Sequence, residues 1–365
     1  MSYARARLFL GISGVGSVVV ATGLVAAFWG RSGNDVGTPT SFSGEVATLA
    51  AFFGCWAVAL LPFDLLGGYV LPRACGRRHP PFGRFLVGLI RGVAVQGVVL
   101  FAVAVATLAA CRAFGDGAAL GVVFVAVVVL GMLQSSMAIA VGGLPPAYRT
   151  DAGFFIQAVK DEGFTGGVFG LFRPQVLLPA RWSEALSAEE FEAVVARRRA
   201  VIASGERLAG LLGAAAWVLA GTALALLLPQ AGGQTATQVV VLYCGTTWWT
   251  FLGLLLLPTL SRNAVLGLDE RVRRDGVSDD VLRSASSKLD ALQDDEPSRP
   301  TVVESIFHPL PSVENRGEAA RPPGVGTWHI ARTMVYLSWA TGGLLSRSVH
   351  CNAGRPQLWV FLPCD

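Results

Sequence analysis

The sequence predicts a mainly α-helical, polytopic membrane protein with a small α+β polar domain assembled from two separate segments. Hydrophobic residues make up 53% of the 365 positions and charged residues only 15%, whereas soluble domains carry roughly 25% charged residues. The mean hydropathy is +0.54. Six stretches are long and apolar enough to cross a bilayer about 30 Å thick, and two long polar segments lie between and after them.

The six apolar stretches predict about six spans, near residues 8–29, 45–71, 85–111, 118–142, 208–228 and 238–258. Basic residues concentrate before the first span and after the second, fourth and sixth. The positive-inside rule then places both termini and both large polar segments in the cytoplasm. We therefore expect a multi-pass protein of a bacterial inner membrane.

These spans divide the chain into five parts. Residues 1–142 hold four transmembrane helices, 143–207 a first cytoplasmic segment, 208–258 two further transmembrane helices, 259–326 a second cytoplasmic segment, and 327–365 an apolar tail. Arg332 interrupts the apolar run of the tail. This favours a helix that lies at the interface or packs on the bundle, with a seventh span as the alternative.

The polar segments carry local structural signals. Arg173-Pro174 divides an apolar stretch and predicts a turn between two short strands. Ser187 precedes Glu190 by three positions, which is the spacing of a capping box, so a helix should begin there and run through Ala200. In the second segment, the apolar positions of residues 279–292 predict an amphipathic helix.

Several features of residues 166–316 have a distinctive order. A strand-turn segment ends Gln-Val-Leu-Leu-Pro179, and residues 186–196 read Leu-Ser-Ala-Glu-Glu-Phe-Glu-Ala-Val-Val-Ala. Two spans follow at once, and Ser261-Arg262 comes just after the second, with Asp269 eight residues beyond Ser261. His308-Pro309 and Arg316 come later. This order resembles the membrane zinc metallopeptidases of the HtpX and CaaX-prenyl-protease type, although that family has two spans before its zinc helix and this chain has four.

The resemblance fails at the metal site. Residues 197–201 read Arg-Arg-Arg-Ala-Val, where the family has His-Glu-x-x-His, a spacing that puts both histidines on one helix face. Its zinc ligands would fall at Arg197, Val201 and Val265, and its general base at Arg198. Zinc needs lone pairs from nitrogen, sulfur or oxygen, which a guanidinium and valine do not offer. We expect a degenerate member with no catalytic residues, no bound metal and no cofactor.

The resemblance also suggests roles for neighbouring residues. Asp269, His308 and Arg316 match family positions that brace the helix carrying the third ligand, so bracing is their expected role. The arginines at 197–199 suit either a solvated, membrane-proximal helix end or a docking surface for acidic lipid or an acidic partner.

Two charges lie within predicted spans. Intramembrane charges are costly and are usually paired, so we expect Asp64 and Arg91 to form an ion pair between helices. A gate or proton site is the alternative interpretation of these two residues.

Three functions remain open at this point. The favoured one is a noncatalytic membrane metallopeptidase homologue, a pseudopeptidase, that binds a protein or peptide partner at the membrane. The alternatives are an active zinc metalloendopeptidase with relocated ligands, and a transporter or channel built from the first four spans. We expect contact with membrane lipid. No basic, aromatic-interleaved stretch indicates nucleic-acid binding, and the sequence leaves the oligomeric state open.

Overall fold

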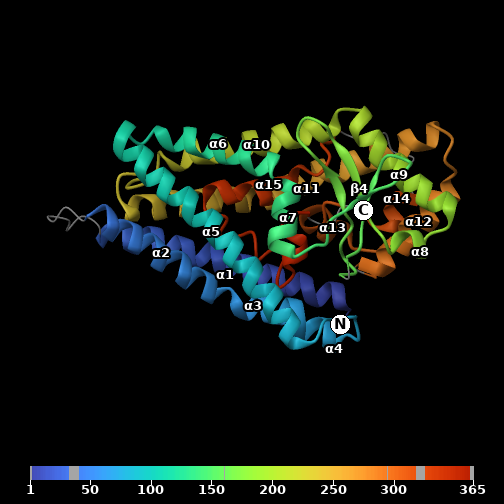
Figure 1. Ribbon diagram of the computed structural model, residues 1–365, viewed down its shortest axis with the longest axis horizontal. Coiled ribbons are helices and arrows are strands. Elements are labelled where there is room, and N and C mark those ends of the chain that lie inside the picture. The colour runs from blue at the N-terminus through green and yellow to red at the C-terminus, as the bar shows by residue number, and fades with distance from the viewer. Residues whose placement is uncertain (1, 33–40, 160, 294, 318–324, 362–365) are drawn as a thin grey trace.

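The structure is a computed structural model that describes residues 2–32, 41–159, 161–293, 295–317 and 325–361. It confirms the predicted fold class, because it is mainly helical, has five to six candidate membrane spans and contains a small four-stranded sheet. Long helices form a bundle at one end, and the sheet and shorter helices form a polar domain at the other (Figure 1). The N and C labels in Figure 1 both lie on the side of the polar domain.

Five helical stretches are long and apolar enough to cross a membrane. They comprise α1 (Tyr3–Ser32), the run Phe42–Ala74, α5 (Phe82–Phe114), α10 (Glu206–Ala225) and α11 (Ala236–Arg274). The run Phe42–Ala74 contains α2 (Phe42–Ala59), α3 (Leu61–Leu65), the π-turn η2 (Leu66–Val70) and α4 (Leu71–Ala74). At 1.5 Å per residue, the 39 residues of α11 extend about 58 Å. This helix is therefore long enough to cross the membrane and carry side chains into the polar domain.

The fourth apolar stretch differs from its prediction. The continuous span expected over 118–142 is broken into α6 (Ala118–Met132) and α7 (Gln134–Gly142), whose axes differ by 77°. Gly131 and the polar pair Ser135-Ser136 flank the break, a composition associated with sharp helix kinks. Among the described residues, five helices are therefore candidate spans, or six if the bent pair counts as one.

The polar domain contains one sheet in the order β1-β2-β4-β3. Its strands are β1 (Tyr148–Arg149), β2 (Phe155–Gln157), β3 (Gly167–Phe169) and β4 (Gln175–Pro179). β2 and β4 are parallel, whereas β3 and β4 form an antiparallel hairpin with Val168 opposite Val176. The turn predicted at Arg173-Pro174 is thus present.

Helices from both polar segments cover this sheet and each other. They are α8 (Trp182–Ala185), α9 (Ala188–Ala203), α12 (Asp279–Gln293), α13 (Thr301–Phe307) and α14 (Val313–Gly317). The capping box predicted for α9 is formed by Ser187 and Glu190. Glu190 also accepts hydrogen bonds from Ser284 Oγ at 2.6 Å and Lys288 Nζ at 2.7 Å. These contacts join α9 to α12, so the two segments build one domain.

The tail packs on the bundle, which is one of its expected arrangements, and none of its described helices is long enough to span a membrane. It contains α15 (Ile330–Leu337) and the short helices η3 (Ser338–Thr341) and η4 (Pro356–Leu358). Most side chains from 328 to 361 are buried, with Leu337, Trp339 and Leu358 fully enclosed. They belong to the same apolar cluster as the spanning helices, and α15 lies among these helices in Figure 1. The tail therefore fills the interior of the bundle; residues 362–365 lie outside the described residues.

Candidate functional site

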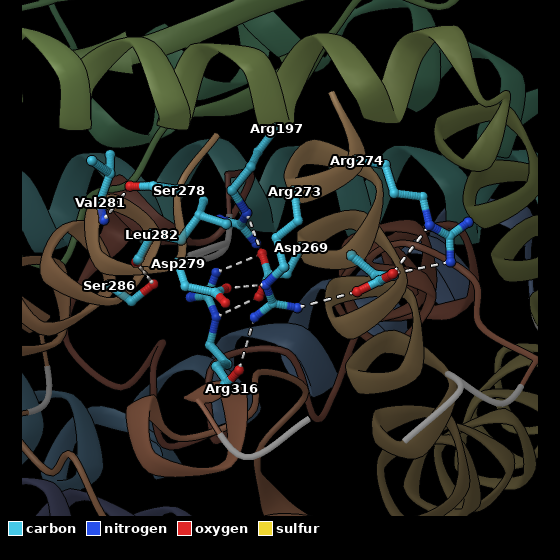
Figure 2. Close-up of polar contacts among 11 residues, drawn as sticks. Arg197, Asp269, Arg273, Arg274, Ser278, Asp279, Val281, Leu282, Ser286 and Arg316 are labelled. Atoms are coloured by element: carbon cyan, nitrogen blue, oxygen red, sulfur yellow. Dashed lines mark hydrogen bonds and ion pairs between the residues drawn. The ribbon is translucent and has the colours of Figure 1, made fainter. Parts of the chain in front are cut away.

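Arg197, the first position at which the resemblance expects a zinc ligand, lies on the face of α9 that packs against α11. Arg197 is 4% exposed and its Nε donates to Asp269 Oδ1 at 2.6 Å. Arg316 approaches the same carboxylate from α14, with Nε 2.8 Å from Oδ2 and Nη2 3.0 Å from Oδ1. Figure 2 shows both guanidinium groups directed at Asp269. A buried carboxylate is thus held between two arginines from different segments of the chain.

The remaining motif positions lie one helical turn away. Val201 follows Arg197 by four residues, and Val265 precedes Asp269 by four. Both valines are 1% exposed, and Val201 shares an apolar cluster with Ala264 and Leu268 of α11. The structure therefore packs α9 against α11, and the side chains at these positions offer hydrocarbon and a guanidinium.

This donor set does not fit a zinc ion. Arg197 has no free lone pair, and its positive charge repels a dication. Across the described ranges, no three or more His, Cys, Asp or Glu side chains gather as metal ligands would. The nearest carboxylate, that of Asp269, is already bound by two arginines.

The neighbouring arginines have different surroundings. Arg198 is 1% exposed and its Nη2 donates to the Thr165 carbonyl at 3.1 Å. Arg199 is exposed and its Nη2 donates to the Ala152 carbonyl at 2.7 Å. Both interpretations of residues 197–199, a solvated helix end and a docking surface, are therefore wrong for Arg197 and Arg198. These two side chains point into the domain, where they make specific polar contacts.

No sequence pattern assigns a role to His329, yet this residue lies next to the arginine network. The residue is buried, begins α15 in a left-handed conformation with φ 55°, and its ring centroid is 3.8 Å from that of Trp328. Burial lowers the pKa of His329 well below its ordinary value of 6.5, and nearby arginines, Arg332 and Arg198 foremost, lower it further. The imidazole is consequently neutral at physiological pH.

The three residues expected to brace the site are only partly brought together. Asp269 and Arg316 are directly bonded, and the Arg316 carbonyl also accepts from Arg273 Nη2 at 3.2 Å. His308 is buried at the end of α13, with its ring 5.5 Å from that of His350 in the tail. His308 and Arg316 line the same small cavity.

The predicted ion pair between Asp64 and Arg91 is wrong. Asp64 is fully buried and pairs with Arg347 of the tail, whose Nε lies 3.1 Å from Oδ2, and it accepts from the Gly354 amide at 2.8 Å. Arg91 is exposed, and its guanidinium lies against the backbone of Gly143. Because the tail enters the bundle, it brings a closer cation to Asp64 than the neighbouring span does.

Arg91 instead lines a large cavity of about 1180 Å³ between α5, the end of α7 and the polar domain. Its wall combines apolar side chains with six arginines and three carboxylates. Two of these arginines, Arg78 and Arg181, lie 3.7 Å from Glu162, and Arg355 is bonded to Asp161. Burial opposes ionisation of Asp161, but Arg355 and a hydrogen bond from Gly163 outweigh it and lower the pKa of this carboxyl. The cavity is therefore amphipathic with an excess of positive charge.

Comparison with known proteins identifies the fold. No family model matches the sequence, and no curated protein matches it. Among solved structures, the crystal structure of S. mikatae Ste24p is similar, with a TM-score of 0.63 and 11% sequence identity, over 81% of this chain and 79% of that chain. The chain therefore has a Ste24p-like, multi-pass helical membrane fold.

Proposed function

We propose that this protein is a noncatalytic homologue of the membrane zinc metallopeptidases, and that it binds a protein or peptide partner at the membrane without cleaving it. Ste24p is a CaaX prenyl protease of the membrane zinc metallopeptidase class. The sequence resemblance over residues 166–316 and the fold likeness point to that same class. The observation that carries the proposal is the pairing of Arg197 and Arg316 with Asp269.

The chemistry of peptide hydrolysis explains why this pairing matters. A catalytic zinc site normally has three protein ligands and a bound water, and in the His-Glu-x-x-His motif the glutamate is the general base. Here Arg198 replaces that base and cannot accept a proton, because a guanidinium stays protonated in proteins. Arg197, Val201 and Val265 occupy the three positions of the zinc ligands, and none of them offers a lone pair to the metal. The inherited helices would then serve as a scaffold for recognition.

The large cavity is the best candidate for that recognition. Its volume exceeds the roughly 300–1,000 Å³ of most small-molecule sites. Apolar side chains such as Phe85 and Leu144 share its wall with Arg84 and Arg91. Neither of these arginines has an ion-pair partner among the described residues. This combination suits an extended segment of a membrane protein that carries both apolar and acidic residues.

Metal analysis tests the proposal. After purification with added zinc in a chelator-free detergent buffer, the wild-type chain should contain far less than one zinc per chain by mass spectrometry. The variant R197H/R198E/V201H/V265E restores every family position and should bind about one zinc per chain. The matched variant R197H/V201H, which supplies only two ligands, should bind it far more weakly.

The outcomes separate the competing functions. Stoichiometric zinc in the wild-type protein, or casein cleavage that a chelator abolishes, would establish an active peptidase with relocated ligands. Failure of the restored variant to take up zinc would show that positions 197, 201 and 265 do not share a metal-site geometry. The transporter alternative has less structural support, because the large apolar cluster of the bundle includes Leu337 and Trp339 of the tail, and the buried Asp64 is paired with Arg347.

A further inference from the structure

A second, much smaller cavity lies where the first span, the polar domain and the tail meet. Its volume is about 50 Å³. The charged and titratable groups that line it are strongly biased toward cations. One carboxylate, Asp290, faces five arginines and two histidines: Arg7, Arg299, Arg316, Arg332, Arg355, His308 and His350.

Three of these arginines already have carboxylate partners. Arg316 is bonded to Asp269, and Arg355 is bonded to Asp161. Arg299 lies 3.4 Å from Asp290 and 3.6 Å from Glu296. The single carboxylate of the cavity wall is therefore already paired, and Arg7 and Arg332 are the two arginines of the wall that form no ion pair among the described residues.

Arg7 is 2% exposed, although it carries a full positive charge. Its guanidinium donates to the carbonyls of Gly67, at 2.7 Å, and His350. Within the described residues it forms no ion pair with a carboxylate, and Asp161, the carboxylate whose charge interacts with it, is already bonded to Arg355. Backbone carbonyls satisfy its hydrogen bonds but do not neutralise its charge, which is unfavourable for a buried cation.

Arg332 also has buried donors that require a partner. Its Nε and Nη1 are buried and have no hydrogen-bond partner in the part of the chain that the structure describes. Buried donors in folded proteins nearly always have a partner, either protein or an ordered molecule. Arg7 from α1 and Arg332 from α15 thus both require negative charge at the same cavity.

We propose that this cavity binds one free inorganic oxyanion of the phosphate class. Guanidinium groups present paired donors that match the oxygens of phosphate. One buried water needs roughly 10–15 Å³ of cavity volume. The cavity, at about 50 Å³, therefore accommodates a single tetrahedral anion but no nucleotide or acyl chain. Water would satisfy the donors without neutralising the charge. The anion therefore joins the first span to the tail.

Equilibrium dialysis of the purified full-length protein with radiolabelled orthophosphate tests this site. The wild-type protein should bind about one phosphate per chain, and sulfate should compete, whereas chloride at equal ionic strength should not. R332Q should weaken phosphate binding about 10- to 100-fold, the loss expected for a charge-assisted hydrogen bond. The matched control is R283Q, because Arg283 is an exposed arginine of α12 outside the cavity.

The competition arm with wild-type protein decides the question even where a variant folds poorly. R332K keeps the charge but loses the guanidinium fork, and should bind phosphate more weakly than the wild type. Lack of saturable phosphate binding, equal displacement by chloride, or wild-type affinity in R332Q would overturn the proposal. Displacement by glycerol 3-phosphate would assign the site to a phosphate ester, including a lipid headgroup, and would refute a free inorganic anion.

Discussion

Replacement of Asp269 by asparagine should destabilise the protein strongly. The substitution keeps the shape of the side chain but leaves Arg197 and Arg316 without their shared counter-charge, and it disrupts hydrogen bonds of 2.6, 2.8 and 3.0 Å. Loss of one partner from a buried ion pair costs about 3–5 kcal/mol. Unfolding entropy is about 2.1 cal/mol/K per residue. For 365 residues unfolding as one unit, the loss corresponds to a fall in Tm of about 4–7 °C.

The adjacent residue supplies the control. Glu270 lies on the same helix and contacts Arg273 at 3.6 Å and Arg274 at 3.0 Å, but its side chain is 37% exposed and that of Arg274 is 75% exposed, so solvent reaches both pairs. Because exposed ion pairs contribute only about 0–1 kcal/mol, E270Q should shift Tm by about 1 °C or less. Tryptophan fluorescence melts in one detergent at one scan rate would measure both variants. Equal shifts for D269N and E270Q would refute the structural role assigned to the buried network.

Three further predictions concern acid stability and the tail. The hydrogen bond from Lys288 is the main cause that lowers the pKa of Glu190 from 4.5 to about 2. The stability contributed by the ionised Glu190 carboxylate is therefore present above pH 4.5 and is lost as the pH falls toward 2. In acid unfolding series, E190Q should lack this component, whereas E189Q, at an exposed neighbour, should retain it. The folded state disfavours a proton on His329, whereas the unfolded chain accepts one. The free energy of unfolding should therefore decrease as the pH is lowered past about 6.5, by up to about 1.4 kcal/mol per pH unit. H329N should reduce this slope between pH 7.5 and 5.5 in melts, and an unchanged slope would count against a buried neutral imidazole. D64N leaves Arg347 buried without its counter-charge, so it should lower the free energy of unfolding by about 3–5 kcal/mol. It should also make the tail accessible to limited proteolysis, which mass spectrometry would detect. R91Q should not, and equal cleavage of both variants would contradict the assigned pairing.

Local sequence patterns predicted much of the fold. The apolar stretches gave the spans because a bilayer requires about 20 apolar residues per helix, and Ser187 and Glu190 formed their capping box because its spacing is local. The same patterns missed the break between α6 and α7 and left open whether the tail lies at the interface, packs on the bundle or forms a seventh span. An apolar segment such as 328–345 has the same composition whether it contacts lipid or the inside of a bundle, so its location depends on partners far away in sequence.

At the candidate site, too, some contacts were predictable from the sequence and others were not. The resemblance implied that the helix at 197–201 and the segment around 265 share one site, and Arg197 contacts Asp269, 72 positions later. It did not reveal that Arg197 and Arg198 are buried, because arginine is almost never fully buried unless it is paired. Asp64 and Arg347 are 283 positions apart, and a lone aspartate in a span does not specify which distant cation it meets. Only the arrangement in space identified that partner.

The position of the tail has a consequence for biogenesis. Residues 328–361 follow every span in the sequence, yet they supply Met334, Leu337 and Trp339 to the middle of the bundle. During synthesis, the membrane helices emerge before the segment that occupies the space between them. The core of the bundle therefore cannot be completed until that segment arrives, and a chain that stops before residue 328 would lack these core side chains.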